Sequence, residues 1–304
     1  MAERQAGVTA LITAYARAYH ATHDHPKIFN DFLADQLFTA EEHVLFDRHL
    51  AGLLSVIDPE LVASNPSPAQ ALALVMQLHN APITLCRSRF VEDQLDAAIA
   101  EGAPQYVILG AGFDTFAFRR TDLMGRLKVL EVDHPVTQAL KKQRVAAAGW
   151  LLPDSLTFIP IDFARDNLME VIKESSFSPH QKSFFSWLGV TFYLTQEVVM
   201  DTLKTVAELA VTGSTITFDY LDNAAFDPKT VDRRVKLMMS IAGQAGEPMK
   251  SGFDPSSLQA ILKEAGFLLV EDLGPGEIQN RYFNGRHDLY RAFEQLHLAR
   301  AVKE

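Results

Sequence analysis

From Gln105 onward the sequence alternates short apolar runs with segments of helical pattern, and this alternation limits the fold more than any other feature. Short apolar runs bounded by glycine, proline or aspartate are typical of strands buried on both faces of a sheet. Strands separated by helices predict an α/β fold whose mostly parallel sheet has helices on both faces. The predicted strands are 106–109, 127–132, 156–161, 183–187, 214–220 and 267–273, and the tail 296–302 is a candidate for a seventh.

The first hundred residues carry helical patterns instead. Ser67 is suited to cap a helix that begins with Pro68, and Gly102 is suited to end the helix before the first strand. A loop with His20, His23 and His25 is expected to be polar and exposed. Helices are predicted over 9–19, 69–78, 84–101, 135–149, 195–213 and 254–266.

The residues after the first three predicted strands suit an adenosine. They are Gly110-Ala111-Gly112, Asp133 and Asp162-Phe163. Two glycines allow a tight turn and close approach of the backbone to a ligand. Asp133 can accept hydrogen bonds from ribose hydroxyls, and Asp162 beside Phe163 can bind an adenine. Because ligands of open α/β sheets bind at the carboxyl ends of the strands, these residues are expected to share one site.

The choice of cofactor depends on phosphate binding. A dinucleotide site requires a third glycine, but Thr115 occupies that position, and no phosphate-binding loop of the Walker type is present. An NAD-dependent oxidoreductase is therefore disfavoured. An adenosine ligand without phosphates fits better, and the pattern predicts S-adenosyl-L-methionine. A glycine pair alone is equally compatible with a simple tight turn, so the acidic residues at the next two strand ends carry this prediction.

Composition excludes several other classes of protein. Lysine and arginine total 28 against 38 acidic residues, which argues against binding to nucleic acid. Cys86 is the single cysteine, so neither an internal disulfide nor a cysteine-cluster zinc site is possible, and no metal is expected. Neither a signal peptide nor an apolar stretch of about 18 residues is evident, which predicts a soluble, cytoplasmic protein with no membrane contact.

Four motifs resemble those of one family of methyltransferases. They are Leu109-Gly110-Ala111-Gly112-Phe113-Asp114-Thr115 followed by Arg119, Glu131-Val132-Asp133-His134-Pro135, Ile161-Asp162-Phe163 and Tyr193-Leu194. The chain resembles the leucine carboxyl methyltransferase family and its bacterial relatives. This resemblance implies a Rossmann-like class I methyltransferase fold, with a seven-stranded sheet and an antiparallel last strand. It also implies a helical cap with lead-in helices over residues 1–102 and a methyltransferase domain over 103–304, joined as one compact unit.

The resemblance also implies roles for site residues. Gly110, beside Ala111 and Gly112, would line the methionine moiety, Asp133 would bind the ribose, and Asp162 with Phe163 the adenine. The family places an arginine from the preceding helix on the cofactor carboxylate. Arg87 shares a helical face with apolar residues that must point inward, whereas Arg89 lies among acidic residues on a solvated face. We therefore expect Arg87 to fill this role.

One position departs from the family pattern. The family carries glutamate before the Tyr-Leu motif, where it holds the cofactor ammonium, but Leu188 stands there in this chain. A leucine side chain cannot accept that hydrogen bond, although a backbone carbonyl can. The departure leaves Leu188 among the predicted cofactor-binding residues but argues against transferring the family's own protein substrate to this chain.

Transfer of a methyl group from a sulfonium depends mainly on alignment of the reactants. We expect an O-methyltransferase whose small-molecule acceptor is a carboxylate, because an ionised carboxylate needs no general base. A phenol or alcohol acceptor would need one, and His20, His23, His25 or Tyr220 would be candidates. Tyr193 and Tyr220 are expected near the methyl group, and residues 249–253 as a lid. A catalytically inactive cofactor-binding protein is the alternative of another class, and the oligomeric state stays open.

Overall fold

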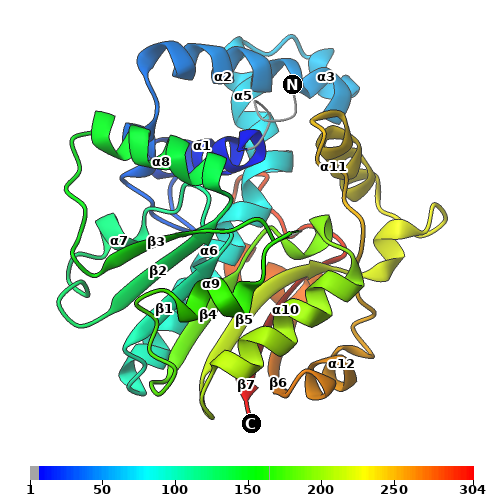
Figure 1. The fold of residues 1–304 in the computed structure, drawn as a ribbon. Helices are drawn as coiled ribbons and strands as arrows, with labels where there is room; N and C mark the ends of the chain where they lie inside the picture. Colours follow the sequence, from blue (N-terminus) through cyan, green and yellow to red (C-terminus); the bar gives the residue numbers. More distant parts are fainter. Residues whose placement is uncertain (1–6, 164) are drawn as a thin grey trace.

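The computed structural model describes residues 7–163 and 165–304, and it confirms the predicted seven-stranded sheet (Figure 1). The strand order is β3-β2-β1-β4-β5-β7-β6. β7 runs antiparallel to both of its neighbours, and the remaining pairs are parallel. The strands are β1 (Gln105–Leu109), β2 (Lys128–Asp133), β3 (Leu156–Pro160), β4 (Ser183–Trp187), β5 (Thr215–Leu221), β6 (Phe267–Leu273) and β7 (Leu296–Lys303).

Side chains alternate between two buried layers along each central strand. In β1, Tyr106 and Ile108 face one layer, which is shared with α6 (Ala81–Ala100) and the N-terminal helices. Val107 and Leu109 face the other layer, beneath α9 (Leu168–Lys173), α10 (Gln196–Leu209) and α12 (Leu258–Glu264).

The longer helices of the chain are α1 (Val8–His23), α2 (Ala40–Gly52), α5 (Pro68–Val75), α6 (Ala81–Ala100), α8 (Pro135–Ala147), α10 (Gln196–Leu209) and α11 (Arg233–Gln244). The shorter ones are α3 (Leu54–Ile57), α4 (Pro59–Val62), α7 (Phe116–Arg119), α9 (Leu168–Lys173), α12 (Leu258–Glu264) and α13 (Pro275–Ile278). The 3₁₀ and π turns are η2 (Ala34–Leu37), η3 (Met76–Asn80), η4 (Thr191–Tyr193), η5 (Asn223–Phe226) and η6 (Gln279–Phe283).

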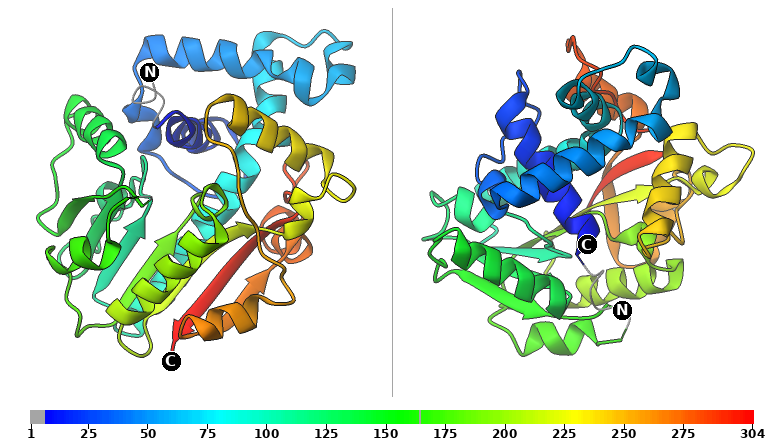
Figure 2. Two further views of the ribbon diagram at one scale, coloured as in Figure 1. Left: turned by 45° about the vertical axis from the view of Figure 1, so that its right-hand side comes forward. Right: turned by 90° about the horizontal axis from the view of Figure 1, so that it is seen from above.

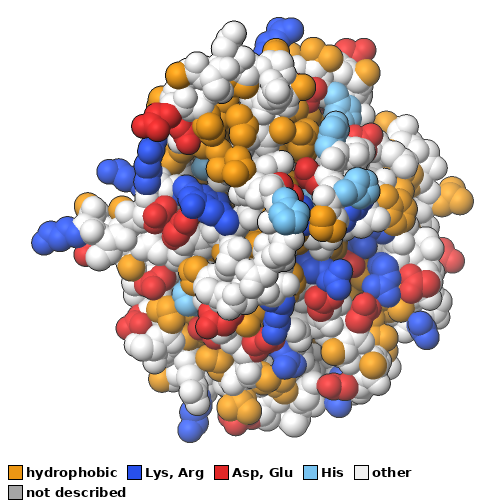
Figure 3. Space-filling model, turned by 180° about the vertical axis from the view of Figure 1, so that it is seen from behind, with side chains coloured by type: hydrophobic (Ala, Val, Ile, Leu, Met, Phe, Trp, Pro, Cys, Tyr) orange, Lys and Arg blue, Asp and Glu red, His pale blue; other side chains and the backbone are white. Residues whose placement is uncertain are grey.

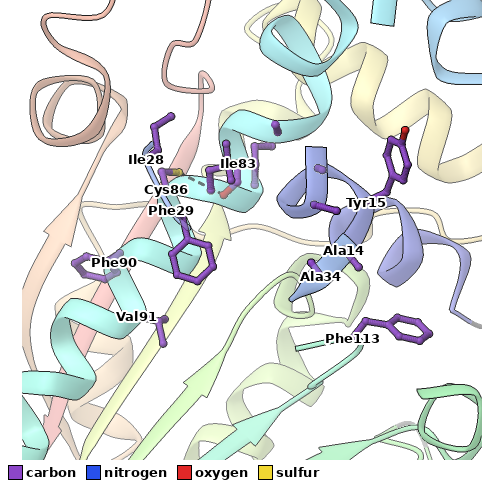
Figure 4. Close-up of a cluster of buried hydrophobic side chains, with 14 of the residues drawn as sticks. Ala14, Tyr15, Ile28, Phe29, Ala34, Ile83, Cys86, Phe90, Val91 and Phe113 are labelled. Carbon is purple, nitrogen blue, oxygen red and sulfur yellow. Dashed lines mark hydrogen bonds between the residues drawn. The ribbon is translucent and has the colours of Figure 1, made fainter. Parts of the chain in front are cut away.

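Helices α1, α2 and α5 lie over the carboxyl ends of the parallel strands (Figures 1 and 2). A buried cluster joins this cap to α6 and to the turn after β1 (Figure 4). In it, Phe29 and Val91 of α6 line one small void, and Phe113 is drawn below α1. The Cys86 thiol is buried in the same cluster, where it donates to the carbonyl of Ile83 at 3.4 Å. The cap and the sheet therefore share one apolar interior.

Three local predictions are wrong. Helix α1 continues through His23, and His20 is fully buried rather than exposed, because its ring bonds Asp24 at 2.8 Å and accepts from the Ile28 N–H at 2.8 Å. The expected break between the helices over 69–78 and 84–101 is filled by the π turn η3. Helix α12 begins at Leu258, since residues 254–257 form a turn instead.

The surface shown in Figure 3 carries basic and acidic side chains interspersed with one another, together with scattered apolar ones. Within residues 7–163 and 165–304, no helix has the length and apolar character needed to cross a membrane.

Replacing Ser67 with alanine tests whether residues 1–102 and 103–304 unfold as one unit. Ser67 accepts from the Gln70 N–H at 3.3 Å, and the Gln70 side chain accepts from the Ser67 N–H at 2.9 Å. Loss of this N-cap should lower the free energy of unfolding by about 1 kcal/mol and Tm by roughly 2–4 °C. Calorimetry should show a single transition that moves as a whole. Ser64→Ala is the control, because its exposed hydroxyl only donates to the carbonyl of Leu61. Two transitions of which one moves would contradict a single compact unit.

Candidate cofactor and active site

A cavity of about 500 Å³ opens at the carboxyl ends of β1 to β4, beneath the cap. This is the edge of the sheet where the chain order reverses between β1 and β4, the usual ligand site of such folds. The strand ends contribute the residues that form its floor. They are Gly110, Ala111, Gly112, Phe113, Asp114, Asp133, His134, Asp162, Leu188, Gly189 and Val190. The structure thus brings together most of the predicted cofactor-binding residues.

The turn after β1 requires glycine at its first position. Gly110 has a φ of +75°, and a Cβ built there would overlap Cγ2 of Val190 from the loop after β4. Farther along the turn, the Gly112 N–H donates to Asp133 Oδ2, and Oδ1 of Asp133 accepts from the His134 N–H at 2.6 Å. Each carboxylate oxygen retains a free lone pair for a ligand. Burial raises the pKa of Asp133 above its usual value, and the two backbone donors oppose that rise.

Arg87 lines the cavity from α6 and is held there by a buried carboxylate. Its Nη1 lies 3.0 Å from Oδ2 of Asp219 on β5, and Oδ1 of Asp219 accepts from the Gly189 N–H at 2.6 Å. A Cβ at Gly189 would lie 2.6 Å from the Arg87 guanidinium, so the glycine leaves room for the cation. Arg89 is exposed and pairs with Asp93 at 2.8 Å. Of the two candidate arginines, only Arg87 therefore reaches the cavity.

Leu188 and Asp162 line the cavity as well, but Phe163 is not among its lining residues. The ring of Phe163 is half-buried and lies 6.4 Å from the ring of Trp187, in the layer beneath α9 and α10. Leu188 also borders a small adjoining void, and Asp114 borders both spaces. A carboxylate is thus present at the wall that Leu188 forms, although it comes from the turn after β1.

The two tyrosines that were predicted near the methyl group lie on opposite sides of the sheet. Tyr193, in η4, lines the cavity, and burial raises the pKa of its phenol so that it stays protonated. Tyr220 does not line the cavity. Its hydroxyl donates to Asp272 at 2.8 Å and its ring stacks on His297. The prediction that Tyr220 lies near the methyl group is wrong. Side chains alternate along β5, so Asp219 faces Arg87 and Tyr220 faces the other side of the sheet.

Arg17 is a cavity residue absent from the predicted set. Ala10, Thr13 and Arg17 lie on one face of α1 and line the cavity. Arg17 pairs with Asp31 at 2.8 Å and donates to the Phe113 carbonyl at 2.7 Å, which ties α1 to the turn after β1. The i, i+3, i+7 spacing of these three residues is visible in the sequence, but the apolar stripe with Tyr15 and Tyr19 on the opposite face gives the stronger pattern.

The connection after α11 closes the top of the cavity. Gly246, Glu247, Pro248 and Lys250 line it, whereas Phe253, predicted as part of a lid, is buried beside Tyr220. The Thr9 hydroxyl of α1 donates to the Glu247 carboxylate, so two segments that are far apart in the sequence meet over the cavity. Part of the predicted lid segment, residues 249–253, thus reaches the site through Lys250.

The residues present fit S-adenosyl-L-methionine. The cavity offers Arg87 for a carboxylate, and Asp133 and Asp162 for hydroxyl and amino donors. Gly110 and Gly189, which have no side chains, let Val190 and Arg87 pack closely along its wall. Its volume lies in the range usual for small-molecule sites. The sheet order with antiparallel β7 and the cavity at the switch point match the class I S-adenosylmethionine-dependent methyltransferase fold that the sequence motifs imply.

Comparison with known proteins identifies the family. The model of the leucine carboxyl methyltransferase family matches residues 10–207. YktD of Bacillus subtilis (strain 168), named provisionally as an S-adenosyl-L-methionine-dependent methyltransferase, is 37% identical over 305 residues and covers 100% of both chains. A Mycobacterium avium (strain 104) protein of the same provisional name is 29% identical over 218 residues, covering 72% of this chain and 67% of its own. The chain belongs to the leucine carboxyl methyltransferase family, and its cofactor is S-adenosyl-L-methionine.

A solved structure supports the fold independently. The crystal structure of a DUF574 family protein from Streptomyces avermitilis matches with a TM-score of 0.57 at 14% identity, and the match covers 96% of this chain and 97% of that one. At this identity the likeness concerns the fold, including the helical cap, since nearly the whole of both chains is aligned.

Proposed function

We propose that the protein transfers the methyl group of S-adenosyl-L-methionine to a carboxylate oxygen of a small-molecule acceptor. When bound, the cofactor supplies an electrophilic methyl carbon that the acceptor oxygen takes up, while the electron pair of the broken C–S bond returns to sulfur. In this proposal Arg87 holds the methionine carboxylate, Asp133 the ribose hydroxyls and Asp162 the adenine amino group. Asp114, beside Leu188, accepts from the methionine ammonium.

The observation that carries the proposal is the placement of the candidate bases. A hydroxyl acceptor would need a general base. His20 is buried with both ring nitrogens hydrogen-bonded, and the Tyr220 hydroxyl donates to Asp272 on the other face of the sheet. Within the described part of the chain, His134 is the one histidine lining the cavity, and it caps α8 next to Asp133. A carboxylate acceptor, with a pKa near 4, is ionised without help from any base.

The experiment that tests this proposal measures the chemistry of the product. The protein is incubated with methyl-labelled S-adenosyl-L-methionine and a low-molecular-weight bacterial extract, and the product is treated with mild base. Methyl esters release volatile labelled methanol, whereas methyl ethers and methylamines do not. We expect base-labile label, formed at a rate that changes less than about threefold between pH 6 and 9, because the acceptor is ionised throughout.

Each other outcome favours a different class. Base-stable label with a rate that rises about tenfold per pH unit would indicate a hydroxyl acceptor and contradict the proposal. Absence of any label, from protein whose Tm rises with S-adenosylhomocysteine, would favour a cofactor-binding protein without turnover.

A further inference from the structure

Part of the cavity wall consists of residues to which the proposed function assigns no group of the cofactor. This part consists of residues from α1, from η4 and from the connection after α11. Helices α1 and α11 both lie at the end of the sheet where the parallel strands end (Figure 2). The residues are Thr9, Ala10, Thr13, Tyr193, Glu247, Pro248 and Lys250. We call them the acceptor wall, because a second substrate must reach the methyl group from a side that the cofactor leaves free.

Lys250 is presented to the cavity from a fixed backbone. Its N–H donates to the Phe192 carbonyl at 2.7 Å, and the hydroxyl of Ser251 donates to the Leu194 carbonyl at 2.7 Å. These two bonds tie the segment to both sides of Tyr193. Lys250 is therefore an exposed residue whose backbone is held against the backbone on either side of Tyr193.

The charges of the cavity single out Lys250. Arg17 pairs with Asp31, and Arg87 pairs with Asp219, so both guanidinium groups are already partly neutralised. Among residues 7–163 and 165–304, the Lys250 ammonium has no hydrogen-bond or ion-pair partner, although it lines the cavity. A cation at the mouth of a cavity attracts anionic ligands and can bind them once they have entered.

The other polar groups of the acceptor wall complement an anion too. The Tyr193 hydroxyl has no partner within the described residues, and burial raises its pKa, so it can only donate to an anionic acceptor. The Glu247 carboxylate is the negative group of this wall, and its hydrogen bond from the Thr9 hydroxyl ties it to α1. Lys250 and Tyr193 thus give the acceptor wall an ammonium and a phenol O–H, both of which can donate to the oxygens of a carboxylate.

We propose that Lys250 is the residue that selects an anionic acceptor, by binding a carboxylate of that acceptor at the acceptor wall beside Tyr193. This inference rests on the proposed methylation of a carboxylate and adds the residue that recognises it. One oxygen of the bound carboxylate, or a second acidic group of the same molecule, contacts the ammonium, and the reacting oxygen points toward the cofactor.

The test uses the base-labile methanol assay with diluted extract, so that the rate reports kcat/KM for the acceptor. We expect Lys250→Met to lower this rate about tenfold to a hundredfold, as loss of a charged hydrogen bond does, and Lys250→Arg to retain most of it. Lys236→Met is the matched control, because Lys236 is an exposed lysine of α11 outside the cavity. Affinity for S-adenosylhomocysteine should stay within about twofold in all three variants. The wild-type rate should fall with added salt, and the Lys250→Met rate should fall less.

The possible failures are distinguishable. Equal rates for Lys250→Met and Lys236→Met, or equal salt dependence, would overturn the role of Lys250 while base-labile product from the wild type upholds the proposed function. Base-stable label from the wild type would overturn the proposed function itself. Weakened binding of S-adenosylhomocysteine to Lys250→Met would place the lysine at the cofactor and overturn its assignment to the acceptor.

Discussion

Gly110→Ala should abolish detectable binding of S-adenosyl-L-methionine, with a loss of at least a hundredfold in affinity. The new methyl group would overlap Val190 Cγ2, so the turn after β1 or the loop after β4 would have to shift, and both line the proposed cofactor site. The φ of +75° adds a backbone cost of about 1–2 kcal/mol to the folded state. Titration calorimetry with S-adenosylhomocysteine measures the affinity for the cofactor site. Thermal unfolding without ligand measures the loss of stability of the folded protein.

Gly285→Ala separates these two effects. Gly285 has nearly the same φ, +76°, but a Cβ there meets no atom within 4 Å. We expect both variants to lose the stability that the backbone conformation costs, and Gly110→Ala to lose more through the overlap with Val190. Only Gly110→Ala should lose the cofactor. If Gly285→Ala also lost it, the cause would be global instability. If Gly110→Ala bound normally, the cofactor would not approach the turn after β1, and the assigned site would be wrong.

The strand ends were predictable because their chemistry is local in sequence. Gly110, Asp133 and Asp162 each directly follow a run whose length and composition indicate a buried strand, and parallel strands bring their carboxyl ends together. Arg87 could be distinguished from Arg89 because helical periodicity separates an inward face from a solvated one. In both cases a short stretch of sequence contains all the information that the prediction needs.

The remaining site residues depend on contacts between distant segments. Tyr220 and Asp219 are neighbours in sequence, but only the tertiary packing of β5 decides which of them faces Arg87. Thr9 and Glu247 meet over the cavity although 238 positions separate them. His20 is buried because Asp24 and Ile28 satisfy its ring, which no periodicity reveals. Sequence patterns thus locate the strand ends that form the floor of the cavity. They do not locate the residues of the cap and of the connection after α11 that close it.

The second large effect is expected from Arg87→Met, compared with Arg89→Met on the same helix. Loss of Arg87 removes the cation assigned to the cofactor carboxylate, and the affinity for S-adenosyl-L-methionine should fall about tenfold to a hundredfold. It also leaves Asp219, which is fully buried, without its ion pair, so the free energy of unfolding should fall by about 3 kcal/mol. Arg89 is exposed, and its loss should change the free energy of unfolding by less than about 1 kcal/mol and leave the affinity unchanged.

The double variant Arg87→Met/Asp219→Asn separates cofactor binding from stability. An asparagine can still accept from the Gly189 N–H, and it removes the unpaired buried charge, so most of the lost stability should return. The cofactor affinity should stay low, because the cation is still missing. If the double variant recovered both, Arg87 would act only as the partner of Asp219, and the methionine carboxylate would need another ligand. Among the residues that the structure describes, Arg17 is the other arginine that lines the cavity, so Arg17→Met would then be the variant that loses the cofactor.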